Sequence, residues 1–484
     1  MNKRVSELIT IEQIKQWNNN DIITITAGTG VGKSYFVKNI LYAFTKAKNK
    51  KILYLIHRVN CINQFKEELK ADNKLDTIDL MSYQHIETSI LNKKNIDLSK
   101  YEYIVADEFH YFMSDASFNI STDISLNYIL NQSCIKIFMS ATGDYCKRYI
   151  NNILHVNTID YEIPINYNFI ESLTFYNLDS TLDNFLDNYI NKDNKAIFFI
   201  QSAKKAYELY LRYKDKCIFN CSKSNKDYYK YVDKNIIDTM LKEEKFNSLA
   251  LITTTCLDAG VNIIDDKVKH IIVDNKDLGS LIQCLGRKRL KNNEKICVYI
   301  KSINNKSLGA TKGHINNKIK KADYLRKHTV KEYLKEFPRS KSNDINNIVY
   351  DIALDEDNKC SKKINELMYF KNLNDICTID TMLMYGKYGY NKYLASKLNI
   401  ENYRLIEEDN KMNKLEIYLN SIVDKKLFKE DQQELIKMID VKVNGKQQKS
   451  YSKLNQGLQM LELPFIIIPK KSNSKRFWII NKIE

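Results

Sequence analysis

The segment that most constrains the fold of this chain is Thr24 to Phe36, TITAGTGVGKSYF. A β-branched run leads into a glycine-rich loop, and a helix is predicted to follow it. The loop matches the phosphate-binding pattern G-x-x-x-x-G-K-[ST] with Ala in place of the first Gly, over Ala27, Gly28, Thr29, Gly30, Val31, Gly32, Lys33 and Ser34. Backbone N–H groups of such a loop and the start of the next helix hold phosphates. We therefore expect a nucleoside triphosphate site, with Lys33 at the β- and γ-phosphates and Ser34 as a ligand of Mg²⁺.

Strand-like and helix-like segments alternate over the first 300 residues. An amphipathic helix is predicted at 7–17, and strands at 52–56, 103–106 and 135–139 follow the loop. A second series of strands is predicted at 195–200, 217–219, 249–253, 269–274 and 295–300. This order is typical of parallel sheets covered by helices on both faces. We expect an α/β fold with two tandem domains, 1–160 and 161–303, joined near Pro164.

The character of the sequence changes after residue 302, where helical spacing replaces the β-branched runs. A mainly helical region is predicted at 304–427. Residues 428–484 then contain two predicted helices and two short strands around the basic loop Pro469 to Arg476. That order resembles a small winged helix, a fold that binds DNA or protein partners. The alternative is a cap packed on the core, with a solvated lysine loop.

The charge of the chain favours a polyanionic partner. There are 75 Lys and Arg residues against 59 Asp and Glu, which gives a formal net charge of +16. Nucleic acid is the first candidate partner, and a membrane surface is the second.

No secretory signal and no apolar run long enough to span a bilayer is apparent, so a cytoplasmic protein is expected. The ten cysteines contain no C-x-x-C pair, which favours reduced, packing thiols over a metal cluster.

Two adjacent carboxylates follow the apolar run Tyr103 to Ala106. Hydrolysis of a phosphoanhydride needs one carboxylate to hold Mg²⁺ and another to orient the attacking water. Asp107 and Glu108 can supply both at the end of a strand. A solvated loop is the alternative reading, but the upstream phosphate loop favours a hydrolytic site, with Asp107 and Ser34 at Mg²⁺ and Glu108 as the catalytic carboxylate.

With His110 these residues spell D-E-F-H, and here the chain resembles the superfamily 2 helicases and translocases of the DEAD/DEAH-box group. The resemblance extends from the first helix to Arg289 and implies two RecA-like domains with ATP between them. Ser140-Ala141-Thr142 is similar to the family's S-A-T, which implies that Ser140 and Thr142 couple the nucleotide and nucleic-acid sites. The family's strand-end contacts to a nucleic-acid backbone are matched by His57, Arg58, Ser82, Tyr83, Gln84, Gln201, Ser202, Thr253 and Thr254.

Two segments of the second domain extend the resemblance. Thr253 to Asn262 is similar to the family's T-x-x-x-x-x-G-x-N segment, which implies that Asp258 and Gly260 lie near the nucleotide. Gln283 to Arg289, QCLGRKR, is similar to the segment that brings arginines to the γ-phosphate in this family.

The family pattern of the arginine segment is Q-R-x-G-R-x-G-R, and this chain departs from it at Cys284 and Leu290. The shorter Q-x-x-G-R-x-R form resembles that of viral origin-binding helicases. It implies that Arg287 is a phosphate ligand and that Gln283 belongs to the catalytic set, and it leaves open whether Arg289 is the arginine finger. A basic nucleic-acid patch is the alternative reading of 287–291.

The residues together predict an ATP-dependent and Mg²⁺-dependent helicase or translocase that acts on single-stranded nucleic acid, with DNA favoured over RNA. One alternative is a nucleic-acid-stimulated ATPase switch or remodeller, for example a subunit of a restriction, defence or replication complex. Another is a binding module with a decayed ATPase. Gln13 and Trp17 are weaker candidates for contacts to adenine, because a Trp on an apolar helix face more often belongs to the core.

Overall fold

The computed structural model describes residues 4–57, 59–114, 121–254, 262–291, 293–338, 348–353, 360–443, 446–461, 463–472 and 475–482. The chain divides into two compact units. The first unit is formed by Met1–Leu173 and Leu178–Tyr403, and the second by Thr174–Asn177 and Arg404–Glu484.

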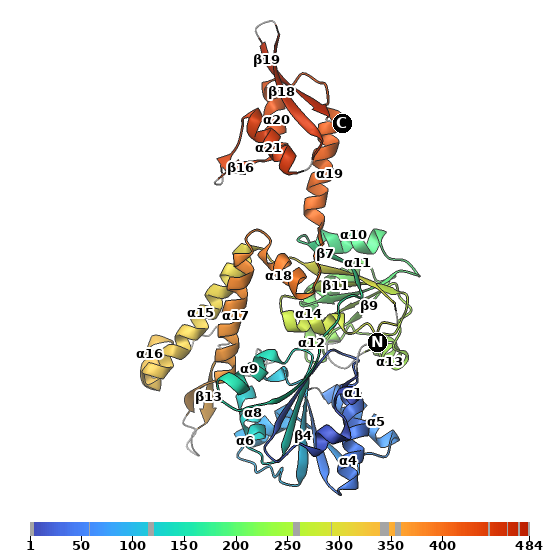
Figure 1. Cartoon of the computed structure of the whole chain (residues 1–484), viewed down its shortest axis with the longest axis vertical. Helices are drawn as coiled ribbons and strands as arrows, with labels where there is room; N and C mark the ends of the chain where they lie inside the picture. The colour runs from blue at the N-terminus through green and yellow to red at the C-terminus, as the bar shows by residue number, and fades with distance from the viewer. Residues whose placement is uncertain are drawn as a thin grey trace. The chain divides into compact units, whose positions relative to one another are not determined.

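The first α/β domain is built on a six-stranded sheet with the order β3-β2-β4-β5-β1-β6. Figure 1 shows helices on both sides of the sheet that contains β4. All five neighbouring pairs are parallel. The strands are β1 (Ile22–Ala27), β2 (Lys51–Ile56), β3 (Ile78–Ser82), β4 (Tyr101–Asp107), β5 (Ile135–Ser140) and β6 (Ile159–Ile163). The helices are α1 (Val5–Leu8), α2 (Ile11–Lys15), α3 (Lys33–Tyr35), the π-helical η1 (Phe36–Leu41), α4 (Tyr42–Ala47), α5 (Val59–Ala71), α6 (Tyr83–Leu91), α7 (Tyr111–Ser114), α8 (Thr122–Leu130) and α9 (Asp144–Asn152).

Alternating side chains of this sheet enter two separate apolar cores. In β2, Tyr54 packs under α5 and η1, whereas Leu53 and Leu55 pack under α6 and α8. Both faces of the sheet are therefore covered by helices, which explains why its strands read as nearly continuous apolar runs. Because β1 and β4 both pair in parallel with β5, their C-terminal ends lie at the same edge of the sheet.

The second α/β domain follows after a short join, Pro164 to Phe169, between β6 and β7. Its strands have the order β7-β12-β11-β8-β10-β9, and β8 pairs in parallel with both β10 and β11. The strands are β7 (Ile170–Tyr176), β8 (Lys195–Ile200), β9 (Cys217–Asn220), β10 (Ala250–Thr253), β11 (Val268–Asp274) and β12 (Ile296–Lys301). The helices are α10 (Ser180–Asn188), α11 (Ala203–Arg212), α12 (Lys226–Tyr229), α13 (Lys234–Glu243) and α14 (Leu278–Leu285).

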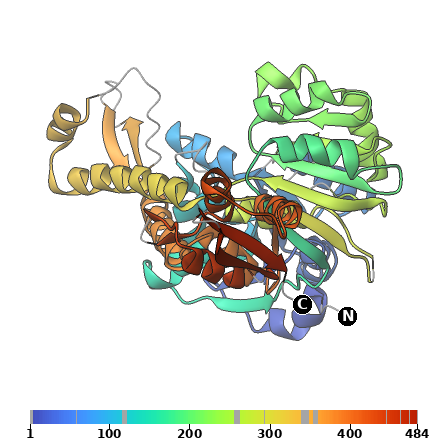
Figure 2. The same ribbon diagram turned by 90° about the horizontal axis from the view of Figure 1, so that it is seen from above.

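Helices dominate the rest of the first unit. They are α15 (Asn305–Lys327), α16 (Val330–Glu336), α17 (Glu366–Met384) and α18 (Gly389–Lys397). Figure 2 shows an antiparallel hairpin beside α15, formed by β13 (Val349–Ala353) and β14 (Cys360–Ile364). The hairpin is fixed to the first domain, because the Tyr350 hydroxyl donates to both oxygens of the buried Asp123 carboxylate at 3.1 Å. The sequence pattern indicated helices here and missed the hairpin, whose strands have only five residues each.

The second unit has its own apolar core, formed by residues such as Leu419, Leu454 and Ile480. Gly457 in α21 packs so closely on Val441 that a Cβ would overlap the valine side chain. The elements are β15 (Arg404–Leu405), α19 (Ile406–Ser421), α20 (Lys429–Ile439), β16 (Lys442–Val443), β17 (Lys446–Gln447), α21 (Tyr451–Met460), β18 (Phe465–Ser472) and β19 (Lys475–Lys482). Strands β18 and β19 form the predicted antiparallel ribbon.

The predicted fold class is confirmed: the chain contains two RecA-like parallel-sheet domains followed by a mainly helical C-terminal part. The predicted helix 7–17 is instead two short helices, because Thr10 takes an extended conformation and caps α2. In the part of the chain that the structure describes, no helix combines the length and apolar character needed to cross a bilayer.

Candidate nucleotide site

The phosphate loop connects β1 to the helical run α3–η1–α4, as its sequence predicted. Gly30 and Gly32 have φ values of +84° and +93°, which residues with a Cβ rarely adopt. The Lys33 side chain is buried, and its ammonium group donates to the carbonyl oxygens of Ala27 at 2.8 Å and Gly28 at 3.1 Å. The loop therefore wraps around the Lys33 side chain. Loops of this kind present backbone N–H groups to a bound anion.

The two predicted carboxylates lie at the end of β4. Glu108 has a φ of +51°, a left-handed conformation that is uncommon for a non-glycine residue and that often marks a functional site. Its Oε2 atom lies 3.2 Å from His110 Nδ1 and accepts a hydrogen bond from the Ser140 hydroxyl at 3.3 Å. The Ser140 oxygen in turn accepts from the backbone N–H of Thr142 at 3.0 Å. A continuous polar chain thus links Glu108 to the S-A-T segment.

The two carboxyl groups differ in acidity. Burial and the neighbouring Glu108 charge raise the pKa of Asp107 above its usual value. Burial alone would also raise the pKa of Glu108, but Lys33, the hydrogen bond with His110 and the charge of Arg287 together hold that pKa well below its usual range. Glu108 is therefore ionised throughout the physiological range, which suits a group that orients and polarises water.

The environment of Asp107 fits a hydrated divalent cation. Among the described residues there is no group of three or more His, Cys, Asp or Glu side chains that could hold a metal. Mg²⁺ does not need one, because it is usually bound through one or two protein oxygens, waters and substrate phosphates. The buried Tyr54 hydroxyl interacts with both Asp107 and Ser34, the two residues expected to hold the ion. Burial and the Asp107 charge raise the pKa of Tyr54, which indicates that its hydroxyl lies beside that carboxylate.

The arginine segment of the second domain lies against the phosphate loop. The Thr29 hydroxyl donates to the Gly286 carbonyl oxygen at 3.1 Å. A Cβ on Gly30 would stand 2.5 Å from Arg289 Nη1, so the Arg289 guanidinium rests on the loop. Arg289 Nε donates to Asn262 Oδ1 at 2.7 Å. Burial, and then the charge of Arg287, lower the pKa of Arg289 to about 10, so it remains a cation at neutral pH.

Arg287 lies deeper in the second domain than Arg289. It is only 3% exposed, and its Nη2 donates to Gln283 Oε1 at 2.8 Å while its Nε donates to the Gln283 carbonyl at 3.2 Å. Its charge nevertheless lowers the pKa of Glu108. Of the two arginines that the sequence singled out, Arg289 lies on the phosphate loop and Arg287 is held by Gln283.

The predicted nucleic-acid contacts fall into three groups. Gln201 and Ser202 are exposed at the end of β8, and Ser202 caps α11. The Gln84 side chain donates to the His57 carbonyl oxygen at 2.9 Å, which links the segments that follow β3 and β2. The Ser82 hydroxyl oxygen accepts from the His85 N–H at 3.0 Å at the start of α6. The buried residues of the set are His57, Tyr83, Thr253 and Thr254.

Tyr83 is the clearest correction to the predicted contacts. It is completely buried, and its hydroxyl donates to the Asp107 carbonyl oxygen at 2.8 Å. Burial removes it from the possible contacts to nucleic acid and makes it a support of the β4 end instead. Three other predicted site residues, Arg58, Asp258 and Gly260, lie outside the described residues.

Two further observations concern residues near the loop. Trp17 belongs to the core of the first domain and is 6% exposed. Gln13 Oε1 accepts a hydrogen bond from the Thr10 backbone N–H at 3.0 Å. The core reading of Trp17 is therefore the correct one. Asn262, which holds Arg289, was not among the predicted site residues, although it is the Asn of the T-x-x-x-x-x-G-x-N segment.

Comparison with known proteins gives matches to part of the chain. Residues 10–124 match the model of the AAA domain family. No curated protein matches the chain.

Several solved structures are similar over a little more than half of the chain. A Dbp5 variant from S. cerevisiae bound to RNA and ADP BeF3 is 17% identical, with a TM-score of 0.44 over 58% of this chain and 79% of that one. Mss116p bound to single-stranded RNA and AMP-PNP is 15% identical, with a TM-score of 0.45 over 60% and 68%. The type ISP restriction-modification enzyme LlaBIII bound to DNA is 12% identical, with a TM-score of 0.41 over 60% and 26%.

Proposed function

We propose that this chain is a nucleic-acid-dependent ATPase of the helicase or translocase type, acting on single-stranded nucleic acid and on DNA in preference to RNA. The observation that carries the proposal is the position of Arg289, a cation of the second domain that lies on the phosphate loop of the first. A site completed by a second domain can respond to domain movement, which is what a nucleic-acid-driven cycle needs.

Each residue of the site has a proposed task. Lys33 leaves the Ala27 and Gly28 carbonyls and binds the β- and γ-phosphates, while the backbone of the loop binds the rest of the triphosphate chain. Ser34 and Asp107 hold Mg²⁺, which neutralises phosphate charge when it is bound. Glu108 orients the attacking water, with His110 and Ser140 fixing its carboxylate. Arg289 meets the charge that develops on the γ-phosphate.

Arg287 and Gln283 have a supporting task in this scheme. Because Arg287 is held by two hydrogen bonds from its guanidinium to Gln283, we assign it to positioning the arginine segment and to keeping Glu108 ionised. Gly260 and Asp258 remain proposed contributors from the same domain. The polar chain from Glu108 through Ser140 to Thr142 is the proposed route by which nucleic-acid binding alters the catalytic carboxylate.

The proposed nucleic-acid contacts lie at strand ends of the two α/β domains. Gln201 and Ser202 are exposed, and Arg58, Ser82, Gln84, Thr253 and Thr254 are retained as proposed contributors, the last two through backbone groups because their side chains are buried. In the second unit we propose a winged-helix-like domain, 428–484, as a further contact. Its ribbon exposes Lys470, Lys471, Lys475 and Arg476.

The proposal is tested by measuring ATP hydrolysis with single-stranded DNA, duplex DNA and RNA over a series of salt concentrations. Phosphate contacts release counterions, so the affinity for nucleic acid should fall steeply as salt rises. We expect stimulation to be strongest with single-stranded DNA. Hydrolysis that no nucleic acid stimulates at low salt would overturn the proposal.

Strand displacement on tailed duplexes then separates a helicase from an ATPase switch or remodeller. A helicase displaces the strand when ATP is present, whereas a switch shows stimulated hydrolysis without displacement. Absence of any ATP hydrolysis would favour the third reading, a binding module with a decayed ATPase.

A further inference from the structure

A cavity of about 1110 Å³ opens next to the phosphate loop. One wall is formed by residues 28–31 of the loop, and another by 163–170, the segment that joins the two α/β domains. The remaining walls come from Ala141, from several residues between 282 and 295 and from residues 399–402. All of these residues belong to the first unit. The cavity therefore begins where the triphosphate chain would be held and continues away from it.

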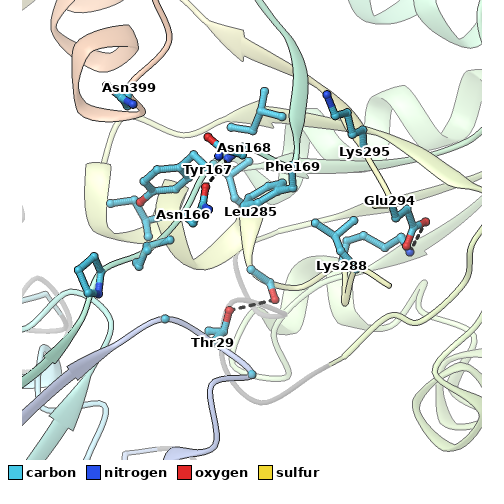
Figure 3. Close-up of a pocket in the computed structure, with 18 of the residues that line it drawn as sticks. Thr29, Asn166, Tyr167, Asn168, Phe169, Leu285, Lys288, Glu294, Lys295 and Asn399 are labelled. Carbon is cyan, nitrogen blue, oxygen red and sulfur yellow. Dashed lines mark hydrogen bonds and ion pairs between the residues drawn. The ribbon is translucent and has the colours of Figure 1, made fainter. Parts of the chain in front are cut away.

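A nucleotide anchored at the loop must place its sugar and base within reach of that loop. The earlier candidates for this contact are occupied, since Trp17 is in the core and Gln13 Oε1 accepts a hydrogen bond from the Thr10 backbone N–H at 3.0 Å. Among the residues lining the cavity, the aromatic ones are Tyr167 and Phe169, with ring centroids 6.1 Å apart. Figure 3 shows both on the joining segment, grouped with Asn166, Asn168 and Leu285. The lining also contains charged side chains, such as Lys288 and Glu294. A pocket that combines apolar contacts with placed polar groups is typical of a ligand site.

The joining segment is held in place by its own hydrogen bonds. The backbone N–H of Asn168 donates to Asn166 Oδ1 at 2.8 Å, and the N–H of Ile170 donates to the Tyr167 carbonyl at 2.9 Å. The Phe169 carbonyl accepts from the N–H of Ile296 in the second sheet at 2.9 Å. These hydrogen bonds hold Tyr167 in a turn. A ligand would therefore not lose binding free energy by ordering this segment.

The segment also touches the phosphate loop directly. A Cβ on Gly28 would stand 3.3 Å from Ile165 Cγ1, so the joining segment passes close to the first glycine of the loop. The segment that carries Tyr167 and Phe169 therefore passes beside the phosphate loop at Ile165.

We propose that this cavity is the nucleoside subsite of the chain, in which a purine base stacks on Tyr167 and the side-chain amides of Asn166 and Asn168 face its polar edge. The inference rests on the proposed ATPase function and adds how the nucleoside is recognised. A planar base gains from stacking on an aromatic ring. An amide offers a donor and an acceptor together, which match the N6 and N7 groups of adenine. Because the segment also joins the two α/β domains, the base would contact the part of the chain that transmits domain movement.

The test compares ligands with and without a base. Dissociation constants of the full-length protein are measured by isothermal titration for Mg-ATP, Mg-GTP and magnesium tripolyphosphate. We expect wild type to bind ATP at least about tenfold more tightly than tripolyphosphate, since base stacking supplies an effect of that size. Tyr167→Ala should weaken ATP binding about tenfold and change tripolyphosphate binding less than twofold. Tyr167→Phe should retain the wild-type affinity, because the stacking surface is kept.

Two controls separate this inference from the proposed function. Tyr189→Ala removes an exposed tyrosine far from the cavity lining and should leave all three constants unchanged. Lys33→Ala should weaken ATP and tripolyphosphate alike, because both ligands use the phosphate loop. Equal ATP affinity in Tyr167→Ala and wild type overturns the nucleoside subsite while leaving the ATPase proposal intact. Failure of wild type to bind either ligand overturns the ATPase proposal itself.

Discussion

The guanidinium group of Arg289 lies on Gly30, so closely that a Cβ on the glycine would stand 2.5 Å from Arg289 Nη1. The two residues belong to different α/β domains. The contact explains the need for glycine at this position of the loop, since a side chain would push the cation away.

Arg289→Ala is expected to lower kcat for ATP by about a thousandfold and to change the dissociation constant of ATP by less than about threefold. An arginine that meets charge developing in the transition state contributes this much to rate and little to ground-state binding. Steady-state hydrolysis and nucleotide titration check the two values. Arg212→Ala, which removes an exposed arginine paired with Asp183, is the matched control and should behave as wild type. A kcat for Arg289→Ala within a factor of ten of wild type would remove Arg289 from the mechanism.

Gly286→Ala is expected to slow hydrolysis by at least about tenfold through the contact between the domains. A Cβ on Gly286 would overlap the Thr29 hydroxyl, which donates to the Gly286 carbonyl at 3.1 Å. Small misplacements of catalytic groups cost this much in rate. Thr29→Ala removes the overlapping oxygen, so the double variant should regain most of the lost activity. Hydrolysis that the second change does not restore would mean that Gly286 acts in another way.

Glu108→Gln is expected to bind ATP with nearly wild-type affinity and to hydrolyse it at least about a hundredfold more slowly. The amide keeps the size of the side chain and loses the charge that His110 and Lys33 stabilise. Single-turnover hydrolysis and nucleotide titration separate the two effects. Wild-type turnover in this variant would sink the catalytic assignment of Glu108.

Replacing the four basic residues of the ribbon, Lys470, Lys471, Lys475 and Arg476, with alanine tests the second unit. These side chains are exposed, so the fold should be retained. If they contact phosphates, the dependence of log affinity on log salt should become less steep by up to about three to four. Fluorescence anisotropy with labelled single-stranded and duplex DNA measures the slope. An unchanged slope would favour the reading of this unit as a cap.

Because His270 is buried, the folded protein is expected to lose stability in acid. It is buried between Phe185 and Tyr299, and burial lowers its pKa to about 4. The unfolded chain has a histidine pKa near 6.5, so between about pH 6.5 and pH 4 the unfolded state binds a proton that the folded state excludes. Stability should therefore fall as pH decreases through this window, by up to about 3 kcal/mol.

His270→Leu should flatten this pH dependence. Urea unfolding of the variant and of wild type at pH 7.5, 6, 5 and 4.5 gives the comparison. His314→Leu, which removes an exposed histidine on α15, should keep the wild-type slope. The prediction concerns the change with pH rather than the absolute stability, because leucine also alters packing against Phe185.

The sequence by itself determined the fold class and the residues that the first domain contributes to the candidate site. Runs such as Ile22 to Thr26 predict buried parallel strands, because a strand covered on both faces must be apolar throughout. Strand ends are local features, so Lys33, Asp107 and Glu108 could be found from the residues beside them. The phosphate loop was recognisable for the same reason, since its backbone conformation depends on its own glycines.

Only the tertiary structure decided which of these residues meet. The sheet order places β5 between β4 and β1, which brings Ser140 to Glu108. Because Tyr83 is buried, its hydroxyl contacts the Asp107 backbone and supports the end of β4. Trp17 is buried in the core of the first domain. Arg287 and Arg289 are two positions apart in sequence, yet one is held by Gln283 and the other lies on Gly30. These relationships join residues that lie far apart along the chain, and the packing of one domain on another has no signature in a local pattern of side chains.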